Sequence, residues 1–170
     1  MKYHLDAKIK LILFFLFFFA CEDNEIIEET GPISITTSNV NVSDFFFNLE
    51  TNSVSEESTT WHIAIKTEGN YNMPSIFFNE NMNVAIYENL VFEELLILPD
   101  TFNSDIETDH SVFRYEGLYE ILSYNIEIHK VGVTNPDHIY LMRNEQGDKL
   151  FKIQFIEYIS GVTVFQYEIL

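Results

Sequence analysis

Apolar and polar residues alternate along much of this chain, and such alternation is the pattern of a half-buried β-strand. The clearest case lies near the C-terminus, where Phe151, Ile153 and Phe155 fall on one predicted face. Lys152 and Gln154 fall on the opposite face. We therefore expect a long strand here, with one side against a core and the other side polar.

Turn-forming residues divide this C-terminal part into two consecutive hairpins. Residues 139–143 lead into a turn-rich break at residues 144–148, which precedes the alternating strand. Ser160-Gly161 suits a tight turn, and another alternating run begins at Val162. Three strands joined by two short connections predict two antiparallel hairpins.

Shorter runs of β-branched and aromatic residues, each bounded by turn formers, predict further strands. They occupy residues 45–49, 61–66, 84–87, 112–115 and 124–129, and β-branched, alternating sequence already begins within residues 31–37. Residues 52–60 are polar and predict a loop. Residues 88–98 carry a helical stripe that Pro99 ends, and they predict one short helix. The chain is therefore expected to form a single antiparallel, all-β domain with one short helix.

The first residues predict export rather than folding. Three lysines precede the short apolar run 11–19, and Ala20-Cys21 follows it directly. A basic start, a short apolar run and a small residue at the cut predict a signal peptide over residues 1–20. The run is shorter than the ~20 residues that a transmembrane helix needs. The Ala-Cys ending resembles a lipobox, which implies a lipid on Cys21; ordinary cleavage beside an incidental cysteine is the alternative.

Acidic residues follow this cysteine. Residues 21–32 contain five carboxylates, which resembles the surface-export signal of Bacteroidetes lipoproteins and also suits a solvated tether. We expect a lipid-anchored protein of the outer membrane, exposed at the cell surface. Cys21 is the only cysteine, so no disulfide can form within one molecule.

The net charge limits the classes of molecule that this chain can bind. Residues 1–20 hold three lysines and one aspartate, so their removal changes the formal charge from −18 to −20. Nucleic acid and anionic membrane surfaces repel such a chain, so we expect membrane contact through the lipid alone and no nucleic-acid binding. The sequence contains no G-x-S-x-G, H-E-x-x-H or glycine-rich phosphate motif, and we expect no enzyme activity.

Three stretches carry a resemblance to a known family. Residues 139–158 read IYLMRNEQGDKLFKIQFIEY, residues 160–169 read SGVTVFQYEI, and residues 60–64 read TWHIA. They resemble, in that order, the C-terminal signature, the last strand and the W-D-I-A strand of the HmuY family. His62 stands where the W-D-I-A motif has aspartate. The HmuY proteins are haem-binding lipoproteins of Bacteroidetes.

The resemblance implies a fold and a function. Residues 33–170 would form a HmuY-like β domain that holds haem b between two strands or loops, with a side chain on each axial position of the iron. The protein would be a hemophore-like part of iron acquisition. It would take haem from a host or the environment and deliver it to a TonB-dependent outer-membrane receptor.

Two histidines are the candidate axial ligands. His129 ends a predicted strand just before the C-terminal signature, where the family places a ligand. His110 lies in a polar loop upstream and is the candidate second ligand. An axial histidine needs a fixed partner for its other ring nitrogen, and Asp109 or Glu127 is a candidate for that role. Aromatic residues near these positions could line the slot for the macrocycle: Phe113, Tyr115, Tyr119 and Tyr124.

Alternative ligands remain open. His138 follows a turn and is the substitute for His129, whereas His62 alternates with Trp61 and is expected to pack or hydrogen-bond within a strand. Met73 and Met82 could offer a thioether, although methionine more often serves packing.

Other functions share the same anchor and fold. The main alternative is a haem-free surface lipoprotein that binds protein, glycan or a different porphyrin. A purely structural surface protein is the third reading, and it predicts no small ligand at all.

Overall fold

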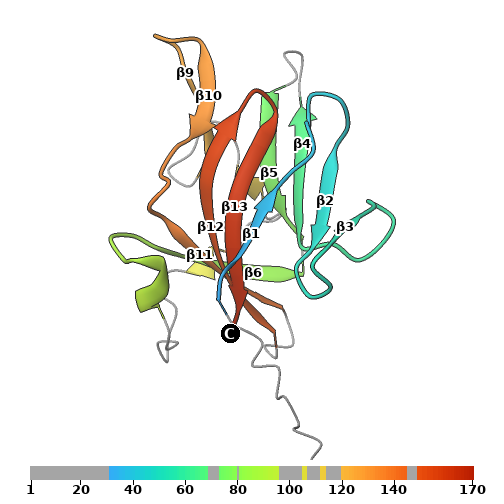
Figure 1. Ribbon diagram of the computed structural model, residues 1–170, viewed down its shortest axis with the longest axis vertical. Helices are drawn as coiled ribbons and strands as arrows, with labels where there is room; N and C mark the ends of the chain where they lie inside the picture. The colour runs from blue at the N-terminus through green and yellow to red at the C-terminus, as the bar shows by residue number, and fades with distance from the viewer. Residues whose placement is uncertain are drawn as a thin grey trace, which may run out of the picture. The chain divides into compact units, whose positions relative to one another are not determined.

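The computed structural model describes residues 31–68, 73–79, 81–95, 105–106, 112–113, 120–144 and 149–170. Every strand pairing within these ranges is antiparallel. The same residues contain one 3₁₀ turn and no α-helix (Figure 1). The all-β fold expected from the alternating pattern is therefore confirmed.

The larger sheet has six strands, and the C-terminal hairpins form its centre. β11, β12 and β13 follow one another through two hairpin connections, which confirms that prediction. A β-bulge interrupts the pairing of β12 with β13 between Phe155 and Glu157. In spatial order the strands are β1 (Ile33–Thr36), β13 (Val162–Ile169), β12 (Leu150–Ile159), β11 (Ile139–Asn144), β6 (Met82–Tyr87) and β7 (Asp105–Ile106).

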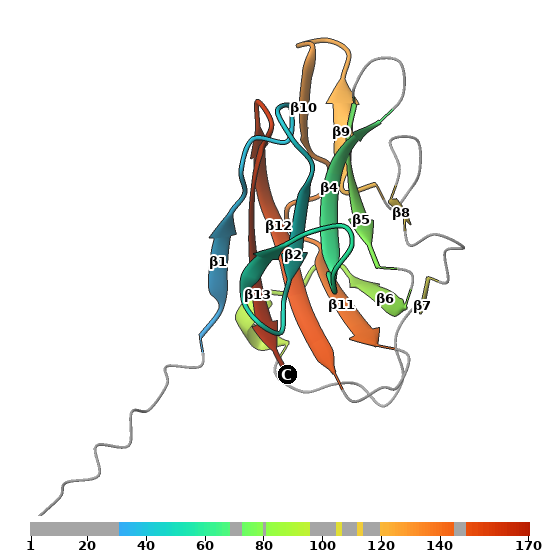
Figure 2. The same ribbon diagram turned by 90° about the vertical axis from the view of Figure 1, so that its right-hand side faces the viewer.

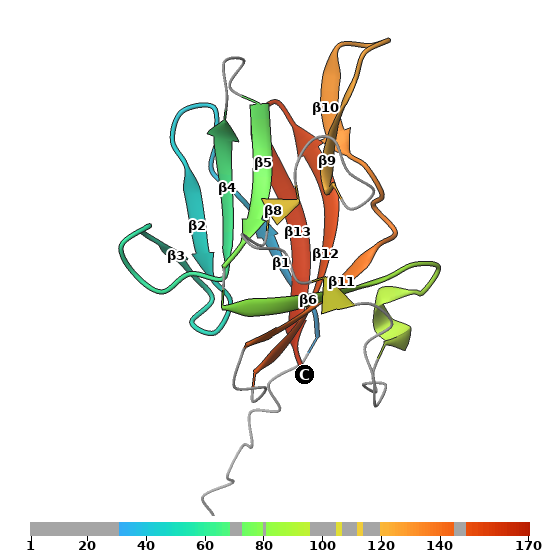
Figure 3. The same cartoon turned by 180° about the vertical axis from the view of Figure 1, so that it is seen from behind.

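The second sheet has five strands and packs against the first. Figure 2 shows β2, β4 and β5 beside β12 and β13, and Figure 3 brings the second sheet to the front. Residues 52–60, expected to be a loop, include the short strand β3. In spatial order the strands are β3 (Ser53–Ser55), β2 (Phe45–Asn48), β4 (Ile63–Glu68), β5 (Met73–Phe78) and β8 (Val112–Phe113).

Large apolar side chains from both sheets fill the space between them. The ring of Phe47 on β2 lies 5.8 Å from that of Phe165 and 6.1 Å from that of Tyr167, both on β13. Phe155 on β12 contacts Phe165 as well, at 5.7 Å. Burying one such side chain contributes about 1.5–3 kcal/mol, so these contacts join the two sheets into one core.

The segment after β6 covers the outer face of the larger sheet, where we expected a helix. It contains only the 3₁₀ turn η1 (Phe92–Glu94). Phe92 and Leu95 pack on the sheet, whereas Leu90 and Val91 of the predicted stripe stay exposed. The helix prediction is wrong for the described residues, because a single turn brings enough apolar surface onto the sheet.

This covering segment also changes the setting of Lys152. The alternating pattern placed Lys152 on a polar face, but its side chain is fully buried beneath the segment. Its ammonium lies 2.7 Å from a carboxylate oxygen of Glu168 and donates to the Leu95 carbonyl at 3.3 Å. The ammonium also lies 4.3 Å from the centre of the Phe92 ring. Lys152 therefore connects the covering segment to β12 and β13.

Residues 124–129 were predicted to be one strand, and the structure turns them into the end of a hairpin. β9 (Leu122–Asn125) pairs with β10 (Lys130–Val133), and the four residues between them form the turn. The Asn125 side chain accepts hydrogen bonds from the amides of Glu127, at 2.9 Å, and Ile128, at 3.3 Å. This local side-chain bonding outweighs the strand preference of the two isoleucines.

The hairpin is held at its base and extends away from the sheets at its tip. Ile121 and Leu122 are buried in the core between the sheets. The amide of Thr134 donates to the Ile121 carbonyl at 2.8 Å and closes the base. Figure 1 shows the tip reaching past the connection between β12 and β13.

Candidate functional site

His129 is the last residue of the hairpin turn. Its φ of 52° lies in the left-handed region, which residues other than glycine adopt rarely and mainly in tight turns. The Asn125 bonds that close the turn therefore also determine where the imidazole is presented. The side chain is exposed beside the start of β10, and β10 lies next to β12.

The ring of His129 is oriented by a tyrosine from the opposite strand of the hairpin. Its Nδ1 lies 2.6 Å from the hydroxyl of Tyr124. The Tyr124 hydroxyl can accept from a protonated Nδ1 or donate to a bare one, so either neutral tautomer is satisfied. Nε2 has no hydrogen bond to the described part of the chain. The geometry thus leaves Nε2 as the nitrogen available to a ligand.

A cavity of about 400 Å³ adjoins this histidine. Its volume is within the range of small-molecule sites, roughly 300–1,000 Å³. The hairpin, the start of β5 and the turn between β12 and β13 all contribute to its wall. The residues that bear on ligand binding are His129, Lys130, Val131, Met73, Tyr158 and Ile159.

This wall offers two kinds of iron ligand and one cation. Met73 carries a thioether, and His129 carries an oriented imidazole. Lys130 supplies a positive charge in a chain with 27 acidic and 9 basic residues. Val131 and Ile159 add apolar surface. Such a mixture suits a flat apolar molecule that bears carboxylates.

Only part of this site could be predicted from the sequence. Met73 was named as an alternative ligand, but the strand that carries it was not predicted, because Pro74 interrupts its pattern. Lys130 directly follows His129 but was not predicted, and Tyr158 joins the cavity only through the folded position of the end of β12. The apolar residues Ile76, Phe77 and Phe78 were the available clue to the strand that carries Met73.

Several predicted site residues lie outside the described residues. They are Cys21 with the rest of residues 1–30, His110 with Asp109, and Tyr115 with Tyr119. The pairing of His129 with His110 therefore stays a prediction. Of the two acidic partners proposed for a histidine, Glu127 is described, but the contact to His129 comes from Tyr124.

The other candidate ligands lie elsewhere. His138 is in the loop before β11, with Nε2 3.6 Å from a Glu88 carboxylate oxygen. Met82 is buried in the core on β6, as expected for a packing residue. Neither side chain lines the cavity beside His129.

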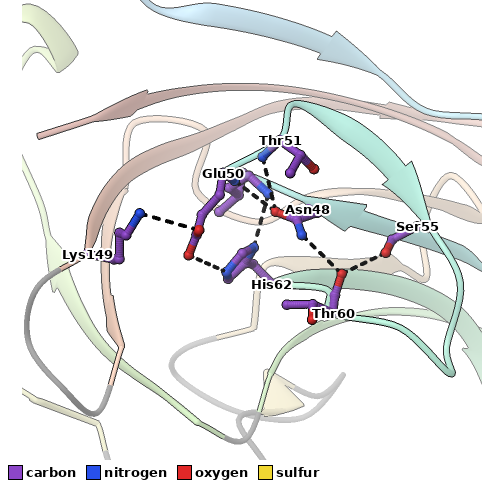
Figure 4. Close-up of polar contacts among 8 residues, drawn as sticks. Asn48, Glu50, Thr51, Ser55, Thr60, His62 and Lys149 are labelled. Carbon is purple, nitrogen blue, oxygen red and sulfur yellow. Dashed lines mark hydrogen bonds and ion pairs between the residues drawn. The ribbon is translucent and has the colours of Figure 1, made fainter.

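His62 is buried and held by polar contacts at the start of β4, as expected (Figure 4). Its Nδ1 accepts from the Leu49 amide at 3.1 Å, so the proton of the neutral ring resides on Nε2. That Nε2 lies 3.6 Å from Glu50, and Glu50 lies 3.4 Å from the Lys149 ammonium. Burial lowers the pKa of His62, nearby Glu50 raises it, and Lys149 lowers it, with burial the largest effect. His62 is thus a neutral structural histidine.

No family model matches the chain, and no curated protein matches it in sequence. The resemblance to HmuY proteins therefore stays a prediction from the sequence. Within the described ranges, no helix has the length and apolar character needed to cross a membrane. The described residues also contain no group of three His, Cys, Asp or Glu side chains that could hold a metal ion.

Proposed function

We propose that this protein is a surface lipoprotein that captures haem in the cavity beside the β9–β10 hairpin. The observation that carries the proposal is the contact between the Tyr124 hydroxyl and Nδ1 of His129 at that cavity. A histidine that binds iron through one nitrogen needs a fixed partner on the other, and this hairpin supplies one. Haem is the cargo of such a protein.

The remaining groups of the cavity fit the same cargo. Val131 and Ile159 would contact the macrocycle, and the ammonium of Lys130 would attract its carboxylates. The second axial ligand is His110 in our sequence-based prediction. Met73 is the candidate that lines the cavity itself. The two choices differ measurably, because His–Met ligation raises the reduction potential of haem.

The setting in the cell is part of the proposal. The lipid on Cys21 would anchor the protein in the outer membrane, and the acidic tether would carry the domain at the cell surface. Delivery of haem to a TonB-dependent receptor rests on the resemblance to HmuY proteins alone. We assign the protein no enzyme activity.

A haemin titration tests this proposal. The chain from residue 22 onward should give a saturable one-to-one Soret shift and sharp bands on reduction. His129→Ala should abolish these bands, whereas His138→Ala, the matched control, should leave them unchanged. A Soret titration of both variants beside the wild type makes the comparison.

The second ligand is identified by two further variants. If Met73→Leu lowers the reduction potential and removes the thioether signature, Met73 binds the iron; if His110→Ala removes the low-spin spectrum instead, His110 does. Absence of saturable haemin binding by the wild type would rule the haem function out.

A further inference from the structure

A second cavity, of about 420 Å³, lies where the loop into β4 approaches the turn between β5 and β6. The loop contributes Ser58, Thr60, Trp61 and His62, and the turn contributes Asn79 and Asn81. This cavity shares no residue with the one beside His129. The two cavities lie at opposite ends of β5, since Met73 begins that strand and Asn79 follows it.

The described residues that line this cavity are uncharged, in an otherwise highly charged chain. None of the described residues that line it is Asp, Glu, Lys or Arg. His62 contributes a neutral ring, because burial lowers its pKa. Glu50, on the far side of that ring, is held by Lys149 (Figure 4). A charged ligand would find no counter-charge among the described lining residues, so these residues favour a neutral molecule.

Hydrogen-bonding groups are nevertheless available. Asn79 accepts from the Asn81 amide at 3.1 Å through Oδ1, which fixes its side chain and leaves Nδ2 to donate. The side-chain amide of Asn81 and the hydroxyls of Ser58 and Thr60 make no hydrogen bond to the described part of the chain. A purely apolar ligand would leave these groups without partners, which is costly.

One aromatic ring completes the lining. Trp61 is partly exposed, and the ring of Phe46 holds it in an edge contact at 5.6 Å. The Lys66 ammonium lies 6.0 Å from the centre of the indole. An indole provides a broad apolar surface with an N–H donor at its edge. A ligand for this site therefore needs an apolar face and a rim of neutral donors and acceptors.

We propose that this cavity binds a neutral sugar residue. A pyranose ring meets both requirements, since its C–H groups form apolar faces and its hydroxyls form a hydrogen-bonding rim. Trp61 would pack against a C–H face. Asn79, Asn81 and Thr60 would bind hydroxyls, because amides and hydroxyls both donate and accept. This binding is independent of the proposed haem site.

The single tryptophan makes the test direct, because Trp61 is the only one in the chain. The mature lipoprotein, kept in a detergent without sugar groups, is titrated with methyl glycosides of glucose, galactose and mannose and with N-acetylglucosamine. Neutral trisaccharides of the same sugars form a second arm. Saturable change in tryptophan fluorescence, matched by calorimetry, is expected with at least one neutral sugar, and weaker binding is expected with anionic glucuronate.

Substitutions in the two cavities test whether the sugar binds in this one. Asn81→Ala removes an exposed amide and should weaken binding about three- to tenfold, the usual effect of one lost hydrogen bond. Asn41→Ala, which removes an amide from the other cavity, and His129→Ala should leave sugar affinity unchanged. Tighter binding of trisaccharides would indicate a polysaccharide as the natural source, and equal binding a free sugar.

Two results would overturn the proposal. One is the absence of saturable binding by both methods with every neutral sugar. The other is binding that Asn81→Ala and Asn79→Ala both leave unchanged while circular dichroism shows them folded. Loss of haemin binding in a parallel assay has no bearing on either result, because the two cavities share no residue.

Discussion

Two histidines of this chain have opposite surroundings. His62 is buried, and a backbone amide 13 residues earlier occupies its Nδ1. His129 is exposed, and the hydroxyl of Tyr124 occupies its Nδ1. From its place before the C-terminal signature, His129 was predicted to be an iron ligand, and this role stays a prediction. The Tyr124 contact was not predicted, because it exists only if residues 126–129 turn back instead of continuing as a strand.

The neutral state of His62 predicts a stability that depends on pH. Its pKa is lowered in the folded chain, so the unfolded chain binds more protons as the pH falls below the unfolded value of 6.5. The stabilisation is therefore complete above about pH 6.5 and is lost as the pH falls through the lower pKa of the folded state. We expect the free energy of unfolding, measured in urea at several pH values, to fall on acidification by less in His62→Gln than in the wild type.

The control for His62→Gln is a variant that lowers the stability without changing a titratable group. Ile76→Val removes one buried methyl group from the core and should lower stability by about 0.5–1.5 kcal/mol at every pH. It should keep the pH slope of the wild type. A His62→Gln slope equal to that of the wild type would show that His62 does not contribute to the acid sensitivity.

Among the secondary-structure elements, strands with long alternating runs could be predicted from the sequence. The conformation of shorter runs depended on tertiary contacts. β12 has ten residues and was predicted together with its two hairpin connections. The predicted helix failed because Phe92 and Leu95 needed only one turn to reach the sheet. The cavity beside His129 could not be predicted from the sequence, because it forms where β5, β10 and the β12–β13 turn meet in the folded chain.

The turn between β12 and β13 predicts a sharp difference between two glycines. Gly161 has a φ of 95°, and a Cβ there would collide with the side chain of Asn39. The neighbouring loop could not easily withdraw, because the Val40 amide donates to the Gly161 carbonyl at 2.8 Å. Gly161→Ala should therefore cost about 1–3 kcal/mol. Gly132→Ala, at a position with nothing within 4 Å of a Cβ, should be neutral or stabilising by up to about 1 kcal/mol.

Urea denaturation of the two glycine variants measures the difference. Both substitutions add the same methyl group, so a change in hydrophobicity affects them alike. Equal stabilities would contradict the strain that we assign to Gly161.

The buried ion pair behind η1 predicts a non-additive pair of substitutions. Glu168→Leu would leave the fully buried Lys152 ammonium without its carboxylate and should cost about 3–5 kcal/mol. Adding Lys152→Met removes the stranded charge, so the double variant should regain most of the lost stability. A double-mutant cycle in urea tests this coupling. A double variant less stable than Glu168→Leu would show that Lys152 stabilises the covering segment mainly through Leu95 and Phe92.

The whole molecule is strongly acidic, and two of the cavities in its described part differ in character. One cavity contains an oriented histidine, a methionine and a lysine, and the other is lined by neutral polar groups and tryptophan. Because they lie at opposite ends of β5, ligands at the two sites need not compete for space. The charge was readable from composition alone, whereas both cavities required the folded arrangement of loops distant in sequence.

The acidity of the whole molecule predicts that salt stabilises it. A formal charge near −20 after loss of residues 1–20 makes the folded chain repel itself. Added salt screens this repulsion, since the Debye length falls from about 30 Å at 0.01 M to about 10 Å at 0.1 M. The melting temperature should therefore rise by roughly 2–4 °C over that range, which corresponds to about 1 kcal/mol, and then level off. Near the sequence pI of 4.4 most of the net charge is gone, and the same salt series should have little effect. A melting temperature that falls with salt at pH 7 would mean that ion pairs such as Lys66 with Glu57 outweigh the net repulsion.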